Sequence, residues 1–148
     1  MRSPLVLLLV ATVAVASGCG GGKSDERFIE AADDICRRQH TEIQKIRQPT
    51  NRTLGSVAAY LARVAPIVQR TNADLHALRA PSGDRSDGWR QLLVASDSSL
   101  THLQRMLSAA REKNAAAYNL AARQLSADDE LFTTTAGGIG LKVCANQA

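Results

Sequence analysis

Hydrophobic residues recur at alternating intervals of three and four along most of the chain after residue 25, with charged and polar residues between them. This spacing places the apolar side chains on one face of an α-helix. The pattern predicts four helices, at residues 25–47, 54–79, about 86–113 and 114–138. No strand pattern of useful length appears. Long helices joined by short loops indicate an all-α fold, an antiparallel up-down four-helix bundle.

The core-facing residues of each predicted helix form a stripe. The first stripe consists of Ile29, Ala32, Cys36, Gln39, Ile43 and Ile46. The second consists of Leu54, Val57, Leu61, Val64, Val68, Thr71, Leu75 and Leu78. The third consists of Trp89, Leu92, Leu93, Ser96, Leu100, Leu103, Met106, Leu107 and Ala110. The fourth is weaker, with Leu120, Leu125, Leu131 and Phe132 on one face.

Capping and helix-breaking residues leave two questions open. Thr53 and Ser86 are suitable N-caps for the second and third helices. Pro66 removes a hydrogen bond within the second helix, so we expect a kink there, although two helices that meet near Ala65 are an alternative. Ser126 is followed by acidic residues and is able to cap a new helix, which leaves the continuity of the fourth helix open.

The amino terminus has the organisation of an export signal. Arg2 is followed by an apolar run from Leu5 to Ala16, in which Thr12 is the only polar residue. A signal peptide has an apolar region of this size, whereas a helix that spans a bilayer needs about 20 apolar residues. Three glycines, at 20–22, follow and form a flexible leash.

The segment Ala16-Ser17-Gly18-Cys19 resembles the lipobox of bacterial lipoproteins, and differs at Ala16, where that family usually has leucine. The resemblance implies a signal peptide at 1–18 and lipidation of Cys19, which becomes the first residue after cleavage. We therefore expect a tether at 19–24 and a bundle domain at 25–148, anchored by lipid at the extracytoplasmic face of the cell membrane. Ordinary secretion with cleavage nearby is the alternative.

The mature region also resembles a loose group of small actinobacterial lipoproteins. The segments AADDICRRQ, LHALRAPSGDRSDGWRQLL and GIGLKVC carry this similarity. The group pairs a cysteine in the first helix with one near the carboxyl terminus, which corresponds here to Cys36 and Cys144. The resemblance implies a helical fold and no particular activity.

The cysteine count agrees with a disulfide in an exported domain. The chain has three cysteines, and lipidation of Cys19 leaves Cys36 and Cys144 as a pair. Outside the cell such a pair is expected to oxidise. The rival interpretation is a metal site made by Cys36, His40 and Cys144, in which the first two lie four residues apart on one helix face. It lacks an evident fourth ligand, which structural zinc sites need.

The charge of the chain argues against nucleic-acid binding. Of 18 lysines and arginines, removal of residues 1–18 takes only Arg2, which leaves 17 basic against 14 acidic side chains. Aromatic residues make up 3% of the chain, fewer than a nucleic-acid interface usually offers. Arg63, Arg70 and Arg79 form a basic strip on the second helix, suited to an acidic envelope protein or to anionic lipid head groups.

The sequence lacks the common signatures of catalysis. His40, His76 and His102 lie on three different predicted helices, and no Glu-x-x-His motif of a di-iron bundle occurs. We therefore predict that the protein is not an enzyme, needs no cofactor and acts as a binding or interaction module at the cell envelope. The alternative is a helical bundle that binds a small ligand or a metal, since a kink at Pro66 opens internal space.

Overall fold

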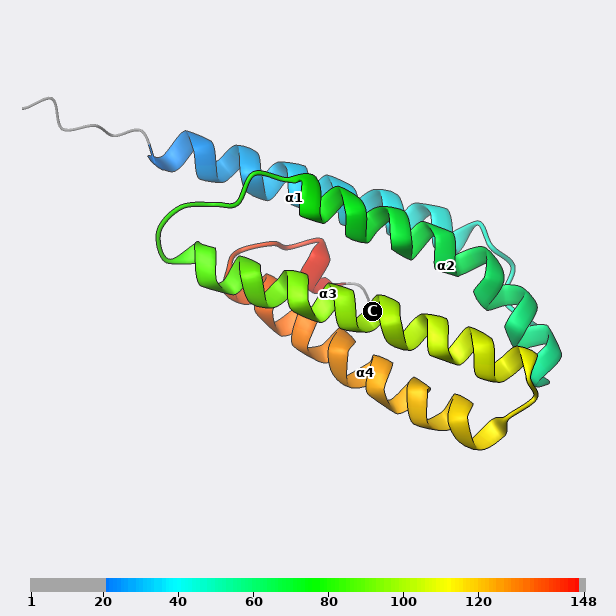
Figure 1. Ribbon diagram of the computed structural model, residues 1–148. Coiled ribbons are helices and arrows are strands. Elements are labelled where there is room, and N and C mark those ends of the chain that lie inside the picture. Colours follow the sequence, from blue (N-terminus) through cyan, green and yellow to red (C-terminus); the bar gives the residue numbers. More distant parts are fainter. Residues whose placement is uncertain (1–20, 147–148) are drawn as a thin grey trace, which may run out of the picture.

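The computed structural model describes residues 21–146, and these residues form α-helices and one short 3-10 helix, with no strand among them (Figure 1). The helices are α1 (Gly21–Gln44), α2 (Leu54–Ala77), α3 (Arg85–Arg111) and α4 (Ala115–Gly138), followed by η1 (Cys144–Asn146). The prediction of an all-helical domain is confirmed. The expected signal peptide and Cys19 lie outside the described residues.

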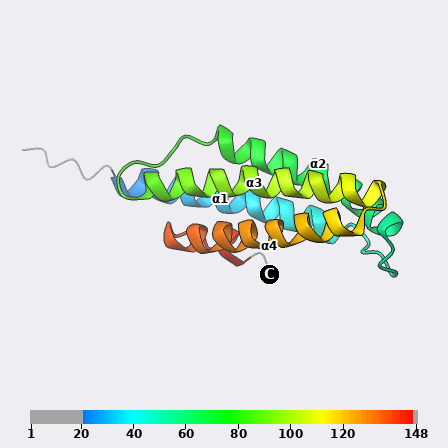
Figure 2. The same ribbon diagram turned by 60° about the horizontal axis from the view of Figure 1, so that its bottom comes forward.

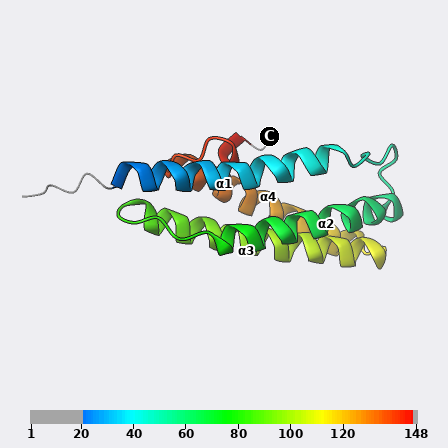
Figure 3. The same cartoon turned by 90° about the horizontal axis from the view of Figure 1, so that it is seen from above.

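Consecutive helices lie side by side. Figures 1 and 3 show that each connection reverses the direction of the chain, so that the loops gather at the two ends of an elongated molecule. Helix α3 makes its most extensive contacts with α4 and then with α2, while α1 packs on α2. Helices α1 and α4 barely contact each other, although the tail that ends in η1 contacts both. Figure 2 shows this tail beside the end of α4.

Several helix ends differ from the predicted ones, and α1 ends at Gln44 and α2 at Ala77, each earlier than predicted. Helix α1 begins at Gly21, so residues that we expected in the tether belong to the helix. Thr53 caps α2 as predicted, and its hydroxyl accepts a hydrogen bond from the backbone N–H of Ser56 at 3.3 Å. The N-cap of α3 is Asp84 rather than Ser86, and its side chain makes no capping hydrogen bond.

Both questions about helix continuity are resolved in favour of single helices. Helix α2 continues through Pro66, and Figure 1 shows it bent rather than broken. Helix α4 continues through the acidic segment after Ser126 to Gly138, so the alternative of a new helix there is wrong. The side chains of Asp128 and Asp129 bond to residues of α3 instead of capping a helix start, which explains the difference.

The buried side chains form two separate clusters. We call the first the disulfide-end core, which consists of Phe28, Ala32, Ile35, Cys36, Leu75, Trp89, Leu92, Ala95, Phe132, Ala136, Ile139, Leu141 and Cys144. We call the second the loop-end core, which consists of Ile46, Ala58, Leu61, Val64, Ile67, Leu103, Met106, Leu107, Ala110 and Ala121. The interior of the bundle is therefore interrupted between its two ends.

The carboxyl-terminal tail is fixed to α1 by two kinds of bond. Cys36 and Cys144 form a disulfide, as predicted. The carboxylate of Asp33, one turn earlier, is buried and accepts hydrogen bonds from the backbone N–H groups of Lys142, Val143 and Cys144 at 2.9–3.2 Å. Gly140, with φ 91°, turns the chain out of α4 in a conformation that favours glycine. The tail thus closes the end of the bundle.

The disulfide should contribute strongly to stability, because it closes a long loop, with a sequence separation of 108 residues. We expect the double variant Cys36→Ala and Cys144→Ala to lose about 2–5 kcal/mol of unfolding free energy, since the bridge restricts the unfolded chain. Urea unfolding monitored by circular dichroism measures this loss. Dithiothreitol should lower the midpoint of the wild-type protein and leave that of the double variant unchanged; equal midpoints for oxidised and reduced wild type would contradict the expectation.

Candidate functional site

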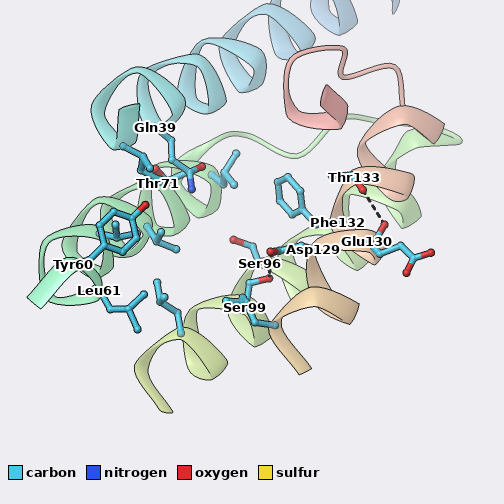
Figure 4. Close-up of a pocket in the computed structure, with 16 residues that line it drawn as sticks. Gln39, Tyr60, Leu61, Thr71, Ser96, Ser99, Asp129, Glu130, Phe132 and Thr133 are labelled. Carbon is cyan, nitrogen blue, oxygen red and sulfur yellow. Dashed lines mark hydrogen bonds between the residues drawn. The ribbon is translucent and has the colours of Figure 1, made fainter. Parts of the chain in front are cut away.

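A cavity of about 620 Å³ lies between the four helices, at the level where the two cores are interrupted (Figure 4). It is lined by Gln39 and Ile43 of α1, Tyr60, Leu61, Val64, Val68, Thr71 and Leu75 of α2, Ser96, Ser99 and Leu103 of α3, and Leu125, Asp129, Glu130, Phe132 and Thr133 of α4. Leu75 and Phe132 belong to the disulfide-end core, and Leu61, Val64 and Leu103 to the loop-end core. The cavity therefore separates the two cores.

Short or polar side chains on the core-facing stripes explain the cavity. Thr71 of α2 and Ser96 of α3 occupy stripe positions where their neighbours are large and apolar, and both are buried. Ser99 of α3 is buried beside them, and Gln39 holds the corresponding position in the stripe of α1. A protein interior is close-packed only where side chains fill the space between elements. Hydroxyl side chains at this level leave that space open.

Asp129 carries a negative charge into the cavity. Its carboxylate accepts a hydrogen bond from the hydroxyl of Ser99 at 3.2 Å. Figure 4 shows Asp129 directed toward Ser96 and Ser99, whereas the carboxylate of Glu130 points away from them. Partial burial of its carboxylate raises the pKa of Asp129 above its ordinary value of 3.8, although the residue as a whole is exposed. The charge of Asp128 acts in the same direction, against the lowering effect of the Ser99 hydrogen bond.

An Asp–His pair lies next to this carboxylate. Nδ1 of His102 on α3 lies 2.5 Å from a carboxylate oxygen of Asp128 on α4, and both side chains are largely buried. Neither residue lines the cavity. The pair links α3 to α4 outside the cavity, and the carboxylate of Asp128 is bonded to His102.

A second polar cluster crosses from α2 to α3. The amide of Asn72 donates hydrogen bonds to the hydroxyl of Ser96 at 3.1 Å and to the carboxylate of Asp97 at 2.8 Å. The same carboxylate oxygen of Asp97 lies 2.9 Å from Nε2 of His76. Burial acts to raise the pKa of Asp97, but the hydrogen bonds from Asn72 and His76 and the charge of His76 outweigh it and lower this pKa. Asn72 thus orients Ser96, a residue of the cavity wall.

The predicted basic strip is not one continuous free surface. Arg70 forms an ion pair with Glu42 of α1, across the α1–α2 contact. Arg63 is exposed and forms no ion pair with the described residues, while Arg79 lines a smaller depression of about 440 Å³ near the start of α1. Their role toward a partner stays a prediction.

The metal site that was the alternative for the cysteines is wrong, because Cys36 and Cys144 bond to each other. Nε2 of His40 lies 2.6 Å from the side-chain amide of Gln44 on the same helix. Within residues 21–146, no group of three or more His, Cys, Asp or Glu side chains is arranged to hold a metal ion. In the same range, no helix combines the length and the apolar character needed to cross a membrane.

Sequence reasoning missed the two residues that matter most to this geometry. Asp33 and Asp129 both stand among other acidic residues on polar helix faces, where a solvated side chain is the usual outcome. The cavity itself did leave a signal, because Gln39, Thr71 and Ser96 interrupt three apolar stripes. Comparisons with protein families, curated proteins and solved structures found no significant match for the chain.

The opposite pKa shifts of Asp129 and Asp97 predict opposite effects of pH on stability. Because the folded-state pKa of Asp129 is raised, the wild type loses stability as the pH rises through that pKa, and Asp129→Asn should become progressively more stable than the wild type. The pKa of Asp97 is lowered, so its contribution is present above pH 3.8 and is lost in acid. Asp97→Asn should therefore become less stable than the wild type as the pH rises.

Urea unfolding at intervals from pH 2.5 to about 7 measures both differences, and each variant serves as the control for the other. Parallel curves for the wild type and Asp129→Asn would contradict the raised pKa of that carboxylate.

Proposed function

We propose that this protein is a non-enzymatic binding protein that holds a small, mainly apolar molecule in the cavity between its helices. The observation that carries the proposal is the cavity of about 620 Å³ between two apolar cores. Ligand sites in proteins have volumes of about 300–1,000 Å³, apolar walls and a few polar groups that orient the ligand. The cavity agrees with each of these properties.

The distribution of polar groups in the wall supports a ligand with a polar end. The wall toward the loop-end core is apolar and includes Leu61, Val64 and Leu103. The hydroxyls of Ser96 and Ser99 and the carboxylate of Asp129 lie together on the α3–α4 side. We propose that the apolar part of the ligand contacts the first region and that its polar end contacts the second.

The contact between helices suggests how a ligand enters. Helices α1 and α4 barely touch, and each contributes partly exposed side chains to the cavity, Gln39 from α1 and Thr133 from α4. The other neighbouring pairs, α1 with α2, α2 with α3 and α3 with α4, are all in closer contact. We propose entry between α1 and α4, the neighbouring helices with the least contact.

The location is part of the proposal and is supported by the sequence. The apolar leader, the lipobox-like segment before Cys19 and the Cys36–Cys144 bridge agree with an exported lipoprotein whose antiparallel up-down bundle lies at the extracytoplasmic face of the membrane. Two acyl chains give a stable anchor where one chain binds only reversibly. Such a position suits a protein that captures apolar molecules, which concentrate in and near the bilayer. An acidic envelope protein or anionic lipid as a partner for the arginines stays a prediction.

Filling the cavity should abolish binding. We call the chain from residue 19 to 148 with Cys19→Ser the soluble variant. The neutral apolar dye N-phenyl-1-naphthylamine should become fluorescent in the soluble variant, and Val64→Phe should reduce this signal about tenfold or more, because the larger ring occupies the cavity. Val64 lines the cavity and is buried, whereas Val94 on α3 is 63% exposed and lies outside it.

Val94→Phe is therefore the matched control and should bind the dye as the parent does. Circular dichroism of both variants verifies that they remain helical. Equal dye affinity of the two phenylalanine variants, or no dye binding by the parent, would contradict the proposed function.

The anchor is tested independently of the cavity. Protein extracted from membranes of its native host should have the mass of the chain from Cys19 onward increased by a diacylglyceryl group. Cys19→Ala should shift the protein out of the lipid-modified fraction and retain the leader. An unmodified Cys19 in the membrane-extracted wild type would refute the lipid anchor and leave the cavity proposal unaffected.

A further inference from the structure

The charged residues that line the cavity are all acidic. Of its 16 lining residues, Asp129 and Glu130 carry charge, and no lysine, arginine or histidine is among them. The chain as a whole has the opposite sign, with a net charge of +4. The negative cavity is therefore a local property of this site and does not reflect the average charge of the protein.

Asp129 has no cation to balance it. It forms no ion pair with any residue between 21 and 146, and its one hydrogen-bond partner there is the neutral hydroxyl of Ser99. A carboxylate accepts several hydrogen bonds, so most of its capacity faces the cavity. The nearest acidic neighbour, Asp128, is engaged with His102. Asp129 is exposed at the edge of the lining, so its carboxylate is accessible to a ligand that carries a positive charge.

The surroundings of Asp129 also suit a positive group with an apolar body. Phe132, one turn further along α4, is a buried aromatic residue that lines the same cavity, as does Tyr60 of α2. The faces of aromatic rings attract ammonium groups. Apolar side chains of the loop-end core line the remainder. An acidic ligand would instead be repelled by Asp129, and no basic residue lines the cavity to compensate.

We propose that the cavity selects cationic amphiphiles, molecules with an apolar body and one positive head such as a protonated amine or a quaternary ammonium group, with the head against Asp129. This inference rests on the proposed function and adds the chemical class of the ligand. Ser99 orients the carboxylate, and the apolar wall accepts the remainder of the molecule.

Three probes with the same chain and different heads test the charge preference. Decylamine, decanol and decanoate compete with N-phenyl-1-naphthylamine for the soluble variant at pH 7, each below its micelle-forming concentration. Decylamine should bind about tenfold more tightly than decanol, as expected for a hydrogen bond between charged groups. Decanoate should bind more weakly than decanol, because its charge repels Asp129.

Asp129→Asn should bring the affinity for decylamine to that for decanol and leave the affinity for decanol unchanged. Asp74→Asn is the matched control, since it removes the same charge from α2 at a partly exposed residue that pairs with Arg38 and does not line the cavity. It should keep the preference for decylamine. Retained decanol binding by Asp129→Asn shows that the variant is folded and its cavity intact.

The outcomes separate the two proposals. If neither the dye nor decanol binds, the proposed function is wrong. If both bind but decylamine has no advantage, or if Asp129→Asn and Asp74→Asn lose that advantage equally, the cavity binds apolar molecules without selecting cations and the further inference is overturned. Tighter binding of decanoate than of decanol would overturn it as well.

Discussion

The interior of a helical bundle stays closed only where the side chains at each level are large enough to fill the space between the helices. At one level of the bundle this condition is not met. Thr71 and Ser96 occupy stripe positions that large apolar residues hold elsewhere, and Ser99 is buried beside them. The cavity, the separation of the core into two clusters and the proposed ligand site all depend on this one level.

A cavity of this kind persists because the helices are held together on both sides of it. On one side the loop-end core fixes their spacing. On the other, the carboxyl-terminal tail lies against both α1 and α4 and is bound to α1 through Asp33 and the Cys36–Cys144 bridge. The tail therefore connects two helices that barely touch each other. Loss of the bridge would loosen the same two helices between which we propose that the ligand enters.

The particular residues show why prediction succeeded for the fold and failed for the site. The stripes of α2 and α3 were recognisable because apolar periodicity follows directly from helix geometry. The start of α1 was predicted late, since glycine is a poor indicator of helix and Gly21 lies in a glycine run. Asp33 and Asp128 look alike in the sequence, as parts of acidic pairs. In the structure, Asp33 accepts hydrogen bonds from three backbone N–H groups, whereas Asp128 bonds to His102 of α3.

The sequence alone predicted the four helices and favoured the pairing of Cys36 with Cys144 over a metal site, and both predictions agree with the structure. These features depend on the periodicity of apolar residues and on the number of cysteines, which are read without knowing which residues pack together in the fold. Only the tertiary structure decided that Asp33 is buried under the tail and that Asp129 faces a cavity with Ser99 as its partner. The environment of a carboxylate is set by the residues packed against it, and those come from helices distant in sequence.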